Sequence, residues 1–218
     1  GGASQYSSGV FVLGSSRFRR FSDLAGATLA FNDPDSLSGF HCVRFHLHAH
    51  QFPPRFFGAA LATGGHQRSL EALLRGDADV AAIDLNVLRR LRRDRAWRRR
   101  LAGLRQLDDV PTLGPYPGQP FVAPKALGPA ALAELRRALV RAAPAELRRL
   151  GWAAIVPVAP GTYGEVRRLL RECARAKDLL CDPAALGRLA AGPLESRRSK
   201  RPARASDGPS PPKKCLRC

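Results

Sequence analysis

The chain contains no methionine and no long apolar run. Its 218 residues are 44% hydrophobic, but no stretch approaches the roughly 18 consecutive apolar residues that a membrane-spanning helix needs, so no such helix is expected. A natural reading frame needs an initiator methionine, whereas this chain starts Gly1-Gly2-Ala3, so we expect a fragment or a processed product. The length suits one globular domain or two small lobes.

Cysteine is scarce and scattered. The five cysteines are Cys42, Cys173, Cys181, Cys215 and Cys218. Because their number is odd and their spacing is irregular, they do not indicate a disulfide framework. The pair Cys215-x-x-Cys218 ends the chain without a second pair that could complete a zinc site. We interpret these two residues as loose thiols and expect neither a metal nor a cofactor.

Acidic residues are few, and the resulting net charge of +18 is unevenly placed. Residues 89–105 hold nine arginines against Asp94, and residues 195–218 hold eight Lys or Arg against two acidic residues, which together supply +14. An arginine-rich helix and a basic tail can contact nucleic-acid phosphates. Because Trp97 is the only aromatic residue among the arginines, and such helix faces are commonly just solvated, nucleic-acid association is the weaker alternative.

Apolar segments alternate with amphipathic ones, which predicts an α/β fold. The first half suggests strands at 9–13, 27–32 and 79–83, with helices starting near Ser36, at 66–75 and after Asp84. The second half suggests strands at 121–123 and 152–158 around a helix that opens at Pro129 and a short one that Gly151 ends. Leu132, Leu135 and Leu139 would share one buried face of the first of these helices.

A last helix, at 163–176, is predicted by a Thr162-x-x-Glu165 capping box. Its Val166, Leu169 and Leu170 follow helical spacing, and we expect this face to pack into a core. From about Pro183 onward the chain is rich in Pro, Ser, Gly and Arg, so residues 183–218 are expected to be disordered.

The stretch FNDPDSLSGF, residues 31–40, places two serines and a glycine directly after an apolar strand. Pro34 cannot donate a ladder hydrogen bond, so the strand must end there. Ser36, Ser38 and Gly39 then lie at a helix N-terminus, where free amides and the helix dipole favour an anion. The alternative is that Ser36 only caps the helix and Ser38 is a solvated residue of the first turn.

Four segments occur in an order that resembles a known family. They are DLAGATLAFNDPDSLSGF, TGGHQRSLEALLRGDADVAAIDLNVL, YPGQPFV and GTYGEVRRLL. The chain from about residue 9 to 172 is similar to the phosphate/phosphite/phosphonate-binding family of ABC-transporter substrate-binding proteins, which have the type 2 periplasmic binding fold. The order of the four segments is more specific to this family than any single segment.

The resemblance implies two α/β lobes that close on a phosphonate, phosphite or phosphate. Ser36, Leu37, Ser38 and Gly39 would form the cradle for the oxyanion, although Leu37 stands where many members carry a hydroxyl residue. His66 would add a donor and Asp84 would face the cleft; alternatively His66 only starts a helix and Asp84 only caps one. The family also implies a non-catalytic role, delivery of solute to a transporter permease or a sensor, and a periplasmic or secreted location.

Compared with the family pattern, we expect the first part of lobe one to be missing from this chain. The resemblance implies a second lobe at 1–118, a returning part of the first lobe at 119–182, and the basic tail at 183–218. A degenerate binding-fold fragment without a ligand is therefore a further alternative. An enzyme is not expected, because no nucleophile, base and orienting residue occur together.

Histidines cluster at His46, His48 and His50, with His41 upstream. On a strand these three alternate residues would share one face and could hold zinc. The histidine segment follows the turn that holds Ser36 and Ser38, which we call the serine turn. It should therefore be helical, and a helix spreads positions i, i+2 and i+4 apart. We therefore expect no metal site here.

Overall fold

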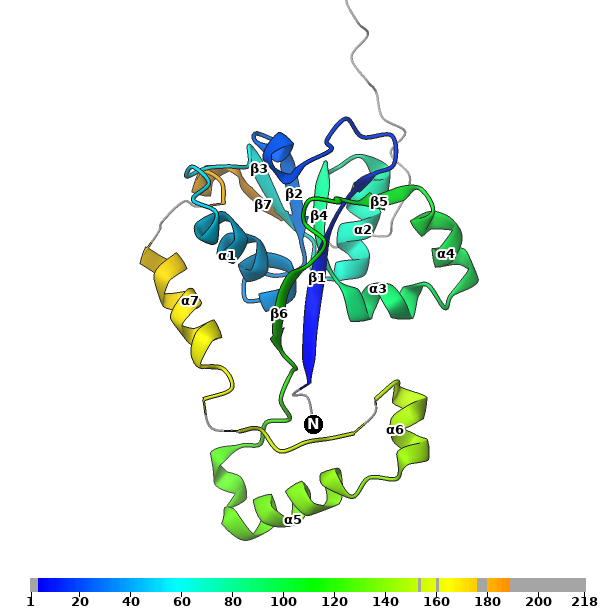
Figure 1. Ribbon diagram of the computed structural model, residues 1–218, viewed down its shortest axis with the longest axis vertical. Coiled ribbons are helices and arrows are strands. Elements are labelled where there is room, and N and C mark those ends of the chain that lie inside the picture. The colour runs from blue at the N-terminus through cyan, green and yellow to red at the C-terminus, as the bar shows by residue number, and fades with distance from the viewer. Residues whose placement is uncertain (1–3, 153, 160, 176–179, 189–218) are drawn as a thin grey trace, which may run out of the picture.

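The computed structural model describes residues 4–152, 154–159, 161–175 and 180–188. In this part of the chain a mixed sheet of seven strands carries helices on both faces, which confirms the predicted α/β class (Figure 1). The strands are β1 (Gln5–Leu13), β2 (Thr28–Phe31), β3 (Ala59–Ala62), β4 (Val80–Asp84), β5 (Leu104–Gln106), β6 (Leu113–Pro117) and β7 (Leu186–Arg188). Their order is β5-β1-β4-β2-β3-β7, and β6 also pairs with β1.

The helices include short and irregular turns as well as regular α-helices. The α-helices are α1 (Cys42–Ala49), α2 (His66–Arg75), α3 (Leu85–Leu91), α4 (Arg95–Leu101), α5 (Pro129–Val140), α6 (Pro144–Leu150) and α7 (Gly164–Arg175). The short turns are η1 (Phe21–Leu24), η2 (Leu37–His41), η3 (Lys125–Leu127) and η4 (Pro183–Ala185). Helices α1 and α7 lie on one side of the sheet, and α2, α3 and α4 on the other (Figure 1).

Each face of the sheet has its own core because strand side chains alternate between the faces. Val10, Leu29 and Phe31 belong to the core under α1, whereas Phe11 and Ala30 belong to the core under α2. The central strands are buried on both faces, which explains why they are apolar throughout. The two cores hold the sheet rigidly between the helical layers.

Strand directions bring distant polar residues to one edge of the sheet. Strands β3, β2 and β4 are parallel, so their carboxyl ends meet at the same edge. Strand β1 runs antiparallel to β4 and pairs Ser8 with Asp84, which places the beginning of β1 there too. The serine turn follows β2, His66 follows β3, and Asp84 is the last residue of β4.

Several predicted elements are confirmed close to their expected bounds. Helix α2 occupies the predicted 66–75, and Gly76 ends it in the left-handed conformation with φ of 79°. The helix expected after Ser36 opens with the wide turn η2 and continues as α1. Asp84 caps α3, and Gly151 ends α6.

The two strands predicted in the second half are wrong. Residues 121–123, and all the described residues within 152–158, lie outside the sheet. A strand needs a neighbouring strand to pair with. Strand β6 leads toward this region but ends at Pro117, and no described strand continues beside residues 121–123. Phe121 and Trp152 nevertheless meet edge to face, with ring centroids 5.9 Å apart. The two segments thus lie together without pairing as strands.

Helix α5 forms where it was predicted, but its apolar face is not buried. Leu132 and Leu135 are 49% and 44% exposed, and Leu139 is half-buried. Figure 1 shows why: α5 and α6 lie beyond the end of the sheet, away from both cores. The expectation that this face packs into a core is therefore corrected.

Helix α7 packs as predicted. Val166 is buried in the core under α1, and Leu169 and Leu170 pack against that core. The Arg44 guanidinium also donates to the carbonyl of Cys173, 2.6 Å away, which ties α7 to α1. Thr162 does not form the expected capping box, because its hydroxyl donates to the Ala159 carbonyl instead.

The expected disordered tail does not begin at residue 183. Residues 183–185 form η4, and β7 pairs in parallel with β3 in the register Leu61↔Gly187. Pairing with an open sheet edge orders this segment despite its composition. The rest of the predicted tail, 189–218, lies outside the described residues and includes Cys215 and Cys218.

Candidate anion-binding site

The serine turn joins β2 to α1 and presents two hydroxyl groups at a helix N-terminus. Ser36 caps the helix, because its Oγ accepts a hydrogen bond from the Gly39 N–H at 3.2 Å. The Oγ atoms of Ser36 and Ser38 lie 3.5 Å apart. The Leu37 and Ser38 N–H groups belong to the first helical turn, where no preceding helical carbonyl is available to accept from them. Hydroxyl and amide donors thus gather at one point.

The wide turn η2 sets how these donors are arranged. The Ser36 carbonyl accepts from the N–H of Phe40 at 3.1 Å and from that of His41 at 3.0 Å. The second of these bonds closes a π-helical turn, which is wider than an α-helical one and is frequent at functional sites. The first turn, which carries the free amides, is therefore wider than that of a regular α-helix.

His66 contacts the serine turn directly. Its Nε2 lies 2.9 Å from the Ser38 Oγ, although the two residues are 28 positions apart in the sequence. Either atom can donate, because a neutral imidazole carries its proton on one of two nitrogens. A proton on Nε2 leaves the Ser38 hydroxyl proton free to point toward a ligand. Burial lowers the pKa of His66 below its ordinary value, and the Asp84 carboxylate partly offsets this shift.

Buried hydrogen bonds hold the His66 loop against the serine loop. The Thr63 Oγ1 donates to the Phe31 carbonyl at 3.0 Å and lies 2.7 Å from the Ser69 Oγ. The Gly64 N–H donates to the Asn32 carbonyl at 2.8 Å. These bonds fix the two loops that follow β2 and β3, so the contact between Ser38 and His66 follows from the parallel strand order.

A hollow of about 300 Å³ opens beside the serine turn. Ser36, Leu37 and Ser38 form one wall, and Tyr6, Gln119 and Tyr163 belong to the rest of the lining. The full lining is Tyr6, Asp35, Ser36, Leu37, Ser38, Pro117, Gly118, Gln119, Pro120 and Tyr163. The Tyr163 hydroxyl donates to the Gly118 carbonyl at 2.7 Å, which joins α7 to the loop after β6.

The charge of this lining is unusual for an anion site. It contains no Lys or Arg, and its one charged side chain is the exposed carboxylate of Asp35. Repulsion by Asp35 opposes an anion, so the hydroxyl and amide donors of the turn must outweigh it. Recognition here would depend on neutral donors in fixed directions rather than on net positive charge.

Asp84 and Gly39 lie behind the hollow and do not line it. The Asp84 Oδ1 accepts from the Asn86 N–H at 2.7 Å, which confirms its interpretation as a helix cap. Asp84 is buried, and its carboxylate offsets part of the lowering of the His66 pKa, so it influences the serine turn electrostatically. Gly39 packs against Asn32 beneath the turn.

His46 and His48 lie on α1, and His50 directly follows this helix. His46 contacts the edge of Phe21 with centroids 4.4 Å apart, and His48 lies 3.6 Å from a Glu172 oxygen. Burial and the neighbouring His50 lower the pKa of His46 to about 4. Over the part of the chain that the structure describes, no group of three or more His, Cys, Asp or Glu residues could hold a metal ion.

The sequence did not identify the far wall of the hollow as part of the site. Tyr6 is the second residue of β1, Pro117 ends β6 and residues 118–120 follow it, and Tyr163 precedes α7, so the wall comes from three separate segments. The motifs YPGQPFV and GTYGEVRRLL contain two of these segments and were the available signal. Tyr6 has no comparable motif around it.

An open α/β sheet with anion-directed donors at the carboxyl ends of parallel strands defines a ligand-binding fold of the periplasmic-binding type. The family profile described as "ABC transporter, phosphonate, periplasmic substrate-binding protein" matches residues 1–163, so the chain belongs to this family. Among curated protein sequences, none matches the chain significantly. Within the described residues, no helix has the length and apolarity to cross a membrane.

Solved structures share the fold at low sequence identity. A binding protein component of an ABC phosphonate transporter from Pseudomonas aeruginosa is 19% identical with a TM-score of 0.66, over 80% of this chain and 59% of that one. PhnD1 from Prochlorococcus marinus, solved with methylphosphonate, is 15% identical with a TM-score of 0.67, over 78% and 68%. An ATP-bound protein from Xanthomonas citri is 20% identical with a TM-score of 0.57, over 80% and 67%. The chain thus spans about three fifths to two thirds of these proteins.

Proposed function

We propose that this chain binds a phosphonate, phosphite or phosphate at the serine turn and releases it unchanged to an ABC transporter. The observation that carries this proposal is the convergence of the Ser36 and Ser38 hydroxyls with first-turn amides at an open hollow. Such a convergence gives several donors to the oxygens of one tetrahedral anion. Membership of the phosphonate-binding family supports the same ligand class.

His66 would make the Ser38 hydroxyl a directed donor. A neutral imidazole that donates from Nε2 to the Ser38 Oγ leaves the hydroxyl proton for the ligand. Because Ser38 is buried, a hydrogen bond from this hydroxyl to an anion would contribute about 1.5–3 kcal/mol. Leu37 would contribute its N–H alone.

The far wall suits the substituent of a phosphonate. Tyr6 and Tyr163 add aromatic side chains to the lining of the hollow that holds the serines. The Tyr6 hydroxyl is protonated at neutral pH and can donate, and burial raises its pKa further, to about 12. An alkyl group could lie against these rings while the oxygens face the turn.

Calorimetric titration of methylphosphonate, phosphite and phosphate into the chain tests the proposal. Ser38→Ala should weaken the affinity by about ten- to a hundredfold, since each 1.4 kcal/mol is about a factor of ten. Ser36→Ala should weaken it as well and should also lower stability by about 1 kcal/mol through loss of the cap. Ser22→Ala, at an exposed serine outside the hollow, is the matched control and should leave the affinity unchanged.

Absence of heat with all three anions, from a chain shown by circular dichroism to be folded, would overturn the proposal. A Ser38→Ala variant that binds as tightly as the wild type would also contradict it, because the serines would then serve only as caps. Loss of stability in Ser36→Ala without loss of affinity would remove Ser36 from the cradle.

A further inference from the structure

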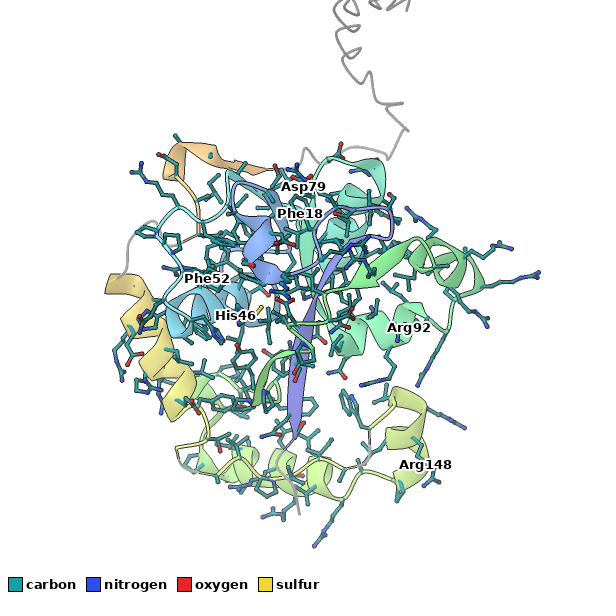
Figure 2. All side chains as sticks on the ribbon, turned by 45° about the horizontal axis from the view of Figure 1, so that its top comes forward. Phe18, His46, Phe52, Asp79, Arg92 and Arg148 are labelled. Carbon is teal, nitrogen blue, oxygen red and sulfur yellow. The ribbon has the colours of Figure 1, made fainter. Side chains whose placement is uncertain are left out.

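Exposed arginines crowd two short helices on the side of the sheet opposite α1. We call Arg90, Arg92, Arg93, Arg95, Arg98 and Arg99 the arginine surface; all are exposed. They belong to α3, α4 and the turn between them. Figure 2 shows side chains of this region, with Arg92 labelled, reaching away from the sheet.

Nearby carboxylates do not neutralise the arginine surface. The Asp94 Oδ1 accepts from the Trp97 N–H at 2.8 Å and so caps α4. Glu71 pairs with Arg100 at 3.4 Å, and Asp77 pairs with Arg75 at 2.8 Å. Within the described residues, none of the six arginines forms an ion pair. Six like charges therefore remain close together without internal compensation.

The core fixes where these charges point. Leu88, Leu91 and Trp97 are buried beneath α3 and α4, so the outer faces of both helices are held in place. Guanidinium groups bind phosphate oxygens through two parallel hydrogen bonds. A fixed array of uncompensated guanidinium groups is thus suited to a partner that offers many phosphates at regular spacing.

Two observations favour a nucleic-acid duplex over a membrane or a single strand. Between residues 85 and 105 no large apolar side chain is exposed, so nothing is available to insert into a lipid interface. Trp97 is only 9% exposed, and Arg100 lies over its ring at 4.3 Å, so it cannot stack on an unpaired base. Contacts would be limited to backbone phosphates.

We propose that the arginine surface binds the phosphate backbone of double-stranded nucleic acid without reading its base sequence. This proposal does not depend on anion binding at the serine turn. The arginine surface lies with α3 and α4 on one side of the sheet, whereas the serine turn leads into α1 on the other side (Figure 1). Each site can therefore be altered while the other is kept.

Fluorescence anisotropy with the full chain and two 20-base-pair DNA duplexes of unrelated sequence tests the proposal over a range of KCl concentrations. Both duplexes should bind equally well, and the logarithm of affinity should fall linearly with the logarithm of salt. Each phosphate contact contributes about 0.9 to the magnitude of that slope. Changing all six residues of the arginine surface to Gln should therefore reduce its magnitude by about five. Changing only Arg92, Arg95 and Arg99 should give about half this reduction.

The matched control changes six other exposed arginines that also form no ion pair within the described residues: Arg136, Arg137, Arg141, Arg148, Arg149 and Arg167. Both six-residue variants lower the net charge from +18 by the same six charges. The control should keep most of the affinity and slope. Equal losses in the two variants would show that binding depends on total charge and would overturn the proposal.

Two further binding measurements distinguish nucleic acid from other anionic partners. Equal affinity for polyglutamate would indicate an acidic protein surface, and stronger binding to phosphatidylglycerol vesicles than to DNA would indicate a membrane; either result would overturn the assignment. Circular dichroism of each variant establishes that it is folded. If the six-residue variant does not fold, the three-residue variant decides, and an unchanged slope in that variant contradicts the proposal.

Discussion

At the scale of single residues, Gly39 is constrained by packing rather than by its backbone angles. A Cβ atom added there would lie 1.9 Å from the Asn32 Oδ1 and 3.2 Å from the Asn32 backbone nitrogen. Real side chains cannot approach so closely. With Asn32 in its present position, the serine turn can lie this close to the end of β2 because residue 39 has no side chain.

Gly39→Ala should lower the free energy of unfolding by about 1–3 kcal/mol, because the added methyl group must displace Asn32 or the turn. Urea denaturation measures this change. Gly164→Ala is the matched control, since a Cβ there meets nothing within 4 Å and the residue begins α7, so its stability should be unchanged or slightly higher. Equal stability of Gly39→Ala and the wild type would show that the turn has room for a side chain.

His46 gives the protein a sensitivity to acid. Burial and His50 lower the pKa of His46 to about 4, compared with an ordinary value of 6.5. Between these two values the unfolded chain binds a proton that the folded chain does not, so stability should fall as the pH is lowered from 6.5 toward 4. His46→Gln removes this group.

Urea denaturation at several pH values between 4.5 and 7.5 tests the effect of His46. The stability difference between wild type and His46→Gln should be constant above pH 7 and should shrink as the pH is lowered, because only the wild type loses this contribution. Parallel curves for the two proteins over the whole range would contradict the assignment of acid sensitivity to His46.

At the scale of elements, local signals predicted some segments and not others. Helix α2 could be placed at both ends because its leucines follow helical spacing and Gly76 terminates it. Strand β3 was missed, since Ala59–Ala62 consists of alanines and a leucine, which do not favour strands by themselves. Strand β6 was also missed. It contains two prolines, which are unfavourable in strands, and it forms as a strand because it pairs with β1.

The two strands that were predicted wrongly also show that a strand depends on a pairing partner. Residues 121–123 and 152–158 have apolar composition suited to strands, yet no ladder lies beside them among the described residues. Composition can indicate that a segment is able to pair, but pairing requires a neighbour that the local sequence does not specify.

The candidate site was predictable in part for a related reason. The serine turn and His66 both follow strands, and parallel strands bring such loops to one edge, so their contact follows from the fold class. The far wall could not be derived in this way. Tyr6 is 30 positions before Ser36, and Tyr163 is more than 120 positions after it, and only tertiary packing brings them together.

At the scale of the whole molecule, exposed apolar side chains concentrate in one region. We call this region the apolar surface: Phe121, Val122, Leu127, Leu132, Leu135, Val140, Leu150, Trp152, Val156 and Val158. Outside it, Leu186 is the one other large apolar residue recorded as exposed in the described part of the chain. Exposed apolar side chains concentrated in one region promote association.

The apolar surface should bind the dye 8-anilinonaphthalene-1-sulfonate and should make the chain self-associate as its concentration rises. Leu132→Glu combined with Leu135→Glu should reduce both effects and change stability by less than about 0.5 kcal/mol, because both side chains are already exposed. Dye fluorescence, analytical ultracentrifugation and urea denaturation measure the three quantities.

Leu186→Glu is the control for the apolar surface, because Leu186 is exposed on β7 outside that region. Its dye binding and self-association should match those of the wild type. A wild-type chain that neither binds the dye nor self-associates would contradict the prediction, and so would a double variant that is strongly destabilised.

The continuous order β2, α1, β3, α2, β4 also bears on how the molecule folds. The serine turn, His66 and Asp84 all come from residues 28–84, whereas the opposite wall of the hollow needs residues from both ends of the described chain. Closing short loops costs less conformational entropy than closing long ones, so contacts within this stretch form sooner. The donors can thus be in place before the opposite wall docks, and local unfolding of that wall would open the hollow while leaving the donors assembled.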